Sequence, residues 1–368
     1  MAKRPIRFFN TTGPCNPDDH YMLPPAERLR GAQLHRYVED SLYWMLHAPR
    51  QTGKTTFLLN WMRELNSTGK VIACYVSVEH CQGMTRIDEA MDNISQSIIT
   101  HAKKSDIPIP NIPIGTGGSK LNEILTDWAI LVAPKELVVL FDEVDVLEGE
   151  VMINFLRQLR SGFATRGIGK FPVSIALVGM RDLKDYLVSA KGGQPVNPGS
   201  PFNIKEDSAV IGNFSKEDIV NLFAQRTKET GQQIELAAID YIWEQSKGQP
   251  WIVNSLFKRA TLQILDSDDF QTVTLDHIKT AREQMILARE THLDSLAYRL
   301  QDPKIKYVLE TLMTGSLDLQ LPQSDSFRIC LDLGLVSNDR DGITIANPIY
   351  REVLAREISA GAQVMLPP

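Results

Sequence analysis

The stretch that decides the fold lies at residues 48–56 and reads Ala48-Pro49-Arg50-Gln51-Thr52-Gly53-Lys54-Thr55-Thr56. An apolar run precedes it at residues 41–47, and an amphipathic run follows it at residues 57–65. A buried strand, a turn containing Gly-Lys-Thr and a helix form the context in which a phosphate-binding loop is found. The stretch departs from the pattern Gly-x-x-x-x-Gly-Lys-[Ser/Thr] at its first position, where Ala48 replaces glycine.

The residue types of this stretch suit a bound triphosphate. Backbone N–H groups would surround the phosphates at the positive end of the following helix. Gly53 lets the backbone approach the ligand, Lys54 would supply a cation to the β- and γ-phosphates, and the Thr55 hydroxyl would ligate Mg²⁺. Ala48 fits the loop if its φ is negative. The alternative is a chance Gly-Lys-Thr on an exposed turn. The predicted nucleotide-binding residues are Pro49, Arg50, Gln51, Thr52, Gly53, Lys54, Thr55 and Thr56.

A second signal is the apolar strand of residues 137–141, which ends in Asp142-Glu143. The carboxyl ends of parallel strands share one edge of a sheet, where the phosphate loop also opens. We expect Asp142 to bind Mg²⁺, and Glu143 to activate the water that attacks the γ-phosphate. An ordinary acidic turn is the alternative. Asp145 is predicted to cap the helix of residues 151–165.

A third signal is the buried strand that begins at residue 171 and ends in Gly179-Met180-Arg181-Asp182. An arginine at the carboxyl end of this strand can reach a γ-phosphate, so Arg181 is the candidate catalytic sensor. The alternative is a surface arginine paired with Asp182 or Asp185.

Composition sets the outer limits of these interpretations. The chain has 368 residues, which predicts two or three domains. Its formal net charge of −6 argues weakly against a protein whose whole surface binds nucleic acid. Its four cysteines show no metal-ligand or disulfide spacing, and no run resembles a signal peptide or a membrane span. We therefore expect a cytoplasmic protein.

The order of the patterns predicts four regions. Residues 1–30 form an N-terminal segment, residues 31–212 an α/β core with a parallel sheet flanked by helices, and residues 213–290 a helical lid. Residues 291–368 contain helices followed by a β-hairpin, which resembles a winged helix. Asp339 and Asp341 at the hairpin tip disfavour contact with a phosphate backbone, so DNA binding by this region is possible but not favoured by charge.

The N-terminal segment contains apolar side chains that we expect to pack against another surface, among them those of Tyr21 and Leu23. They would cover the edge of the core or the adenine ring of a nucleotide, and the sequence leaves both open.

These residues together make the chain similar to the AAA+ P-loop ATPases, specifically the prokaryotic AAA-like or archaeal-type ATPase group close to the STAND signalling ATPases and the origin-recognition ATPases. The resemblance covers nearly the whole chain. It rests on residues 53–55, on Phe-Asp-Glu at 141–143, on Gly-Met-Arg-Asp at 179–182, on Gly-Gln-Pro at 248–250 and on Asn-Pro-Ile-Tyr at 347–350. The resemblance implies that Arg181 senses the γ-phosphate, that Pro250 lies against the base, and that the segment around Tyr21 and Leu23 approaches the base. Arg157, Arg160 and Arg166 are candidates for an arginine finger, and their spacing selects none of them.

The predicted function is that of a Mg²⁺-dependent ATPase that binds and hydrolyses ATP and works as a nucleotide-dependent conformational switch. The alternative is a nucleotide-gated module that binds DNA or a protein with little or no hydrolysis. A protein effector or self-assembly is the expected partner, and no membrane is expected.

Overall fold

The computed structural model describes residues 7–30, 34–167, 169–180, 207–288, 291–315, 321–339 and 342–364. The chain forms two compact units. The α/β unit comprises Pro25–Ala48 and Lys54–Ile211. The second, which we call the lid unit, comprises the N-terminal segment up to Pro24, the loop Pro49–Gly53, and Gly212 to the C-terminus. The four regions that the sequence predicts, with their boundaries, stay a prediction.

The α/β unit is built on a six-stranded sheet with the order β1-β6-β2-β5-β4-β3. Every pairing in it is parallel except that of β1 with β6. The strand β2, which leads into the phosphate-loop stretch, lies between β5 and β6. The strands are β1 Leu29–Arg30, β2 Tyr43–His47, β3 Val71–Ser77, β4 Glu136–Asp142, β5 Ser174–Gly179 and β6 Asp207–Ile211.

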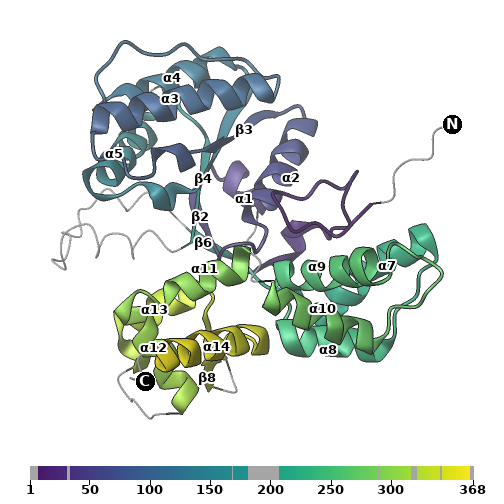
Figure 1. Ribbon diagram of the computed structural model, residues 1–368. Coiled ribbons are helices and arrows are strands. Elements are labelled where there is room, and N and C mark those ends of the chain that lie inside the picture. Colours follow the sequence, from purple (N-terminus) through teal and green to yellow (C-terminus); the bar gives the residue numbers. More distant parts are fainter. Residues whose placement is uncertain are drawn as a thin grey trace. The chain divides into compact units, whose positions relative to one another are not determined.

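Both faces of this sheet are buried, which explains why its strands β2, β4 and β5 are mainly apolar. Alternate residues of β2 separate onto the two faces: Tyr43 and Met45 pack on one side, Trp44 and Leu46 on the other. The helices α3 Ile87–Lys104, α4 Lys120–Leu131 and α5 Gly149–Thr165 cover the first face, and α1 Leu34–Glu39 and α2 Lys54–Ser67 cover the second (Figure 1).

Two local predictions in this unit are wrong. The sequence predicts a helix that begins at Arg30, but Leu29 and Arg30 pair with β6 as an edge strand, and the helix α1 begins at Leu34. Asp145 was expected to cap α5, but it lies in a 3-10 turn, and the residue before the helix is Glu148, whose side chain makes no capping bond. Acidic residues spaced along a turn do not show which of them precedes the helix.

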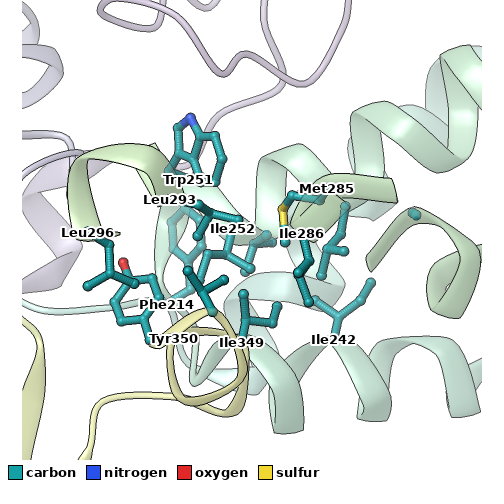
Figure 2. Packing of buried hydrophobic residues seen from close by; sticks show 14 of the residues in the cluster. Phe214, Ile242, Trp251, Ile252, Met285, Ile286, Leu293, Leu296, Ile349 and Tyr350 are labelled. Carbon is teal, nitrogen blue, oxygen red and sulfur yellow. The ribbon is translucent and has the colours of Figure 1, made fainter. Parts of the chain in front are cut away.

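The lid unit is mostly helical and shares one hydrophobic core. In Figure 2, Ile349 and Tyr350 of the C-terminal helix lie beside Phe214, and Trp251 and Ile252 belong to the same cluster. Its elements are α7 Lys216–Thr230, α8 Leu236–Ser246, α9 Pro250–Lys258, a π-helical turn Arg259–Ile264, α10 Leu275–Leu287, α11 Thr291–Arg299, α12 Pro303–Thr314, a 3-10 turn Leu321–Gln323, α13 Asp325–Asp332, the hairpin strands β7 Val336–Asp339 and β8 Gly342–Ile345, and α14 Pro348–Val364.

Local chemistry sets the helix ends of this unit as the sequence suggests. Ser215 and Asp218 form a reciprocal capping box at the start of α7. Between α8 and α9, Gly248 has a φ of +75° and lies so close to Phe214 that an added Cβ would be 1.9 Å from the Phe214 carbonyl oxygen. Pro250 occupies the first turn of α9, where its missing N–H costs nothing.

Candidate nucleotide site

The phosphate-loop stretch connects β2 to α2. The helix begins at Lys54, earlier than the amphipathic run from Phe57 indicates, so Lys54 and Thr55 lie in its first turn. The free N–H groups and the positive end of the helix dipole are concentrated in this turn. The sequence places Lys54 and Thr55 where an anion would be bound.

Lys54 contacts the residue at which the loop pattern is broken. Its Nζ donates a hydrogen bond to the Ala48 carbonyl oxygen at 2.6 Å. Ala48 is buried, and it is not among the residues with a positive φ, as the sequence requires of an alanine at this position. Lys54 is half-buried in the first turn of the helix, where its ammonium group could bind an anion.

Asp142 and Thr55 meet directly. The Thr55 hydroxyl donates to Asp142 Oδ2 at 2.7 Å, and the Glu143 amide donates to Asp142 Oδ1 at 2.9 Å. Asp142 is 1% exposed, and burial raises the pKa of its carboxyl, while the Thr55 hydrogen bond and the positive charge of Lys54 oppose that rise. A buried carboxylate gains from a cation, so a hydroxyl and a carboxylate in contact suit Mg²⁺.

Across the described ranges, no three or more His, Cys, Asp or Glu side chains gather so that they could hold a metal ion. Mg²⁺ commonly takes only one or two protein carboxylates and completes its coordination with water and substrate phosphates. The pair Thr55 and Asp142 fits that pattern better than it fits a metal cage made by the protein alone.

Glu143 follows in a left-handed backbone conformation, with φ +62° and ψ +34°. A non-glycine residue seldom adopts this conformation, and such strain is concentrated at functional sites. The Ser77 hydroxyl donates to Glu143 Oε2 at 3.0 Å. Burial and the neighbouring Asp142 raise the pKa of Glu143 to about 7, the range in which a carboxylate exchanges protons near neutral pH.

Two side chains of this cluster carry no signal in the sequence. Tyr75 donates to Asp142 Oδ2 at 3.3 Å, and Ser77 holds Glu143. Both lie on β3, and they reach the carboxylates because β3 pairs with β4 in the register that sets Ser77 opposite Asp142. Only this pairing, and no local pattern, could have revealed them.

The remaining predicted loop residues lie as follows. Arg50 and Gln51 are exposed, and Gln51 has a φ of +59°. Thr52 is buried, and its hydroxyl donates to the Pro49 carbonyl at 2.8 Å. Thr56 lies in the first turn of α2, where it is buried. Arg181, the candidate sensor, lies outside the described residues, as do Asp182 and Asp185.

The N-terminal segment is attached to the lid helices. Tyr21 is fully buried, with the Phe9 ring centroid at 4.9 Å and the Arg7 guanidinium 5.0 Å from its own ring centroid. Met22 accepts a hydrogen bond from Gln225 Nε2 at 2.8 Å. Tyr21 therefore covers the core of the lid unit, and Leu23 packs against the same core. Contact of Tyr21, Leu23 and Pro250 with a base stays a prediction; Pro250 is buried at the start of α9.

The three candidate finger arginines differ in their surroundings. Arg166 donates to the Ser41 carbonyl, and its guanidinium lies 3.9 Å from the centroid of the Phe163 ring. Arg157 and Arg160 are exposed on α5. Arg166 therefore has a structural contact within its own unit.

Within the parts that the structure describes, no helix combines the length and the apolar character needed to cross a bilayer.

No protein-family model and no curated protein matches the sequence. Among solved structures, a Walker-type ATPase of Pyrococcus abyssi superimposes with a TM-score of 0.65 at 16% identity, over 94% of this chain and 99% of that one. ORC2 of Aeropyrum pernix gives 0.49 at 13% identity, over 90% and 92%. The RuvB Holliday junction branch migration motor of Thermotoga maritima gives 0.46 at 15%, over 87% and 92%.

The first match shows a likeness of fold, and with the parallel sheet flanked by helices it confirms the predicted fold class, a P-loop NTPase α/β fold followed by a mainly helical C-terminal part.

Proposed function

We propose that the protein is a Mg²⁺-dependent ATPase. The observation that carries the proposal is the 2.7 Å hydrogen bond between the Thr55 hydroxyl and Asp142, which joins the end of the phosphate loop to the end of β4. Two such groups, with Lys54 one residue away and a strained glutamate adjacent, form the arrangement expected around a magnesium triphosphate. The fold of the Pyrococcus ATPase supports the same reading.

The division of labour follows from the positions of the side chains. Thr55 and Asp142 would hold Mg²⁺, which when bound supplies positive charge to the phosphate oxygens. Lys54 would leave the Ala48 carbonyl and bind the phosphates, because a charge-assisted bond to an anion is stronger than a bond to a neutral carbonyl. Binding of ATP therefore competes with a contact that the protein makes in its own loop.

Glu143 would take the proton of the attacking water. Its carboxylate, with a pKa of about 7, has a protonation equilibrium close to physiological pH, as suits a general base. Water attacks the γ-phosphorus in line with the departing ADP oxygen, and Lys54 and Arg181 offset the charge that develops. We propose this role for Arg181 from its position in the sequence, two residues after the end of β5.

The test is single-turnover hydrolysis of ATP. The substitution Glu143→Gln should retain ATP binding and lower the hydrolysis rate by roughly a hundredfold or more, because the amide cannot accept the proton. Glu136→Gln, at an exposed glutamate that opens the same strand, is the matched control and should hydrolyse at the normal rate. Turnover by Glu143→Gln equal to the control would contradict the role of Glu143.

A second candidate function has its own observation. The Ser77 hydroxyl occupies Glu143 Oε2, and an enzyme in which this contact persists would hydrolyse ATP slowly or not at all. The protein would then be a nucleotide-gated module for DNA or a protein. Steady-state phosphate release with and without duplex DNA, with molecular size measured with and without ATP, separates the two. Size changes without phosphate release favour the module.

We also propose that nucleotide state shifts the conformation of the lid and C-terminal regions, since a ligand changes a conformation only through contacts that differ between states. The helices and hairpin of residues 291–364 support the winged-helix interpretation of this part.

A further inference from the structure

The lid unit contains a tight turn at Gly334, between α13 and β7. Gly334 has a φ of +69°, its amide donates to the Leu331 carbonyl at 2.9 Å, and the Leu335 amide donates to the Cys330 carbonyl at 2.9 Å. Cys330 and Leu335 are buried in the core of the unit. The turn is therefore fixed by its own hydrogen bonds and by the core beneath it.

This turn lies against the first residue of the loop Pro49–Gly53, which belongs to the same unit. A Cβ added to Gly334 would lie 2.7 Å from both Cβ and Cγ of Pro49. Carbon atoms do not approach so closely, so the absence of a side chain at residue 334 is what allows the proline ring to lie there. The two residues are 285 positions apart in the sequence (334 − 49).

Pro49 is joined to the rest of its loop. The Thr52 hydroxyl donates to the Pro49 carbonyl at 2.8 Å, and the Thr52 side chain is buried. A displacement of Pro49 would therefore move Thr52 and with it the amides that precede Gly53. Those amides are the groups proposed to hold the phosphates.

The turn is also joined to the lid helices. Ile349 and Tyr350, at the start of α14, belong to the same hydrophobic cluster as Trp251 and Ile252 of α9 (Figure 2). Arg282 of α10 pairs with Glu352 of α14. The described helices α9 and α10 and the C-terminal region share one core and an ion pair, so a movement of one carries the other.

We propose that Gly334 is a positioning residue for the phosphate loop: its bare Cα receives the Pro49 ring and so ties the conformation of the loop to the C-terminal region. This inference rests on the proposed function, since it concerns the same phosphate site. Nucleotide binding that rearranges the loop is transmitted through Pro49 to the Gly334 turn, and a partner bound to the C-terminal region changes nucleotide affinity through the same contact.

The test compares two glycines with the same backbone conformation. Gly334→Ala introduces the clash with Pro49. Gly315→Ala places an alanine at a φ of +70° with no atom within 4 Å, so it carries the same backbone strain without the clash. Equilibrium binding of a fluorescent ATP analogue to the full-length protein is measured for both, with thermal unfolding recorded in parallel.

We expect Gly334→Ala to bind the analogue about tenfold more weakly than Gly315→Ala, because small displacements of binding groups have effects of this order. A third variant makes the result specific. Pro49→Gly removes both clashing carbons, so adding Gly334→Ala to it should weaken binding no more than adding Gly315→Ala does. A merely structural defect at Gly334 would persist in the Pro49→Gly background.

The outcomes separate the inference from the proposed function. Equal affinity of the two alanine variants, or an undiminished Gly334→Ala effect in the Pro49→Gly background, would overturn the role of Gly334 alone. Absence of analogue binding by the unmodified protein would overturn the proposed function together with this inference.

Discussion

Replacing Ser77 by alanine should move the pH dependence of ATP hydrolysis upward. The Ser77 hydroxyl donates to the Glu143 carboxylate at 3.0 Å, and it also accepts from the Glu79 amide at 3.2 Å, which fixes its orientation. A hydrogen bond donated to a carboxylate favours the charged form and so lowers its pKa. Burial and Asp142 already raise the pKa of Glu143 to about 7, and loss of the hydroxyl removes the group that opposes them.

The magnitude follows from the geometry. Hydrogen bonds to charged groups contribute about 1.5–3 kcal/mol when well formed. At 3.0 Å this bond is at the long end for a hydroxyl donor, and the carboxylate is half-buried, so we take about 1 kcal/mol. Because one pKa unit corresponds to 1.36 kcal/mol, the pKa of Glu143 should rise by about 0.7 unit. We expect bound Mg²⁺ and ATP to shift the pKa of Glu143 equally in Ser77→Ala and in the unmodified protein, so the difference in pKa between the two proteins remains.

The assay is single-turnover hydrolysis with the protein in excess over ATP and with saturating Mg²⁺, between about pH 5.5 and 9, a range that brackets the pKa of Glu143. The rate should rise with pH as Glu143 loses its proton, and the pH of half-maximal rate should be higher for Ser77→Ala than for the unmodified protein. Ser67→Ala, which removes an exposed hydroxyl from the end of α2, is the control. A half-maximal pH that stays the same or falls for Ser77→Ala would refute the reasoning.

Two stability predictions concern buried contacts. His292 hydrogen-bonds to the Tyr350 hydroxyl, and burial lowers its pKa to about 4. The unfolded chain therefore binds the proton first, and the free energy of unfolding should fall by up to about 3 kcal/mol as the pH drops from about 6.5 to 4. Urea unfolding should show a smaller loss for His292→Gln than for the exposed-site control His35→Gln, and equal losses would exclude His292 as the cause. Gly162→Ala would place its Cβ 2.2 Å from the Phe171 ring in the core. Denaturant unfolding should therefore show a free energy of unfolding about 1–2 kcal/mol lower for Gly162→Ala than for the control Gly167→Ala, where the space around the glycine is open. Equal free energies of unfolding for the two variants would show that the core relaxes around the methyl group.

Local rules account for the parts of the fold that were predicted correctly. Apolar runs predicted the parallel strands because both faces of that sheet are buried. The position of residues 142–143 near the phosphate loop could be predicted because the carboxyl ends of parallel strands share one edge of the sheet. The capping box at Ser215 and the Gly-Gln-Pro junction are local hydrogen-bond and backbone requirements, so they are visible in short windows. The pattern of two short strands joined by an Asp-Gly turn also predicted the hairpin of β7 and β8.

The parts that the sequence could not give depend on pairing between distant strands. Ser77 reaches Glu143 only through the register of β3 against β4, and Tyr75 reaches Asp142 by the same pairing. The Gly334 turn could be read as a helix end, but its contact with Pro49 has no local signature. The sequence left two positions open for Tyr21, and its burial depends on distant helices: its neighbour Phe9 packs against Phe223 of α7 and Phe257 of α9, far along the chain.

Ala48 shows why the loop tolerates a residue other than glycine at its first position. Its amide donates to the Gly179 carbonyl of β5 at 3.4 Å, so the backbone there still continues the strand rather than turning. Its methyl group is buried in the cluster that contains Phe57 and Val178, where a side chain adds apolar contact that glycine would lack. Only its carbonyl faces the site, as the acceptor for Lys54. The acceptor at this position is thus a backbone carbonyl, which alanine and glycine have in common. Packing of the methyl group accounts for alanine in place of glycine.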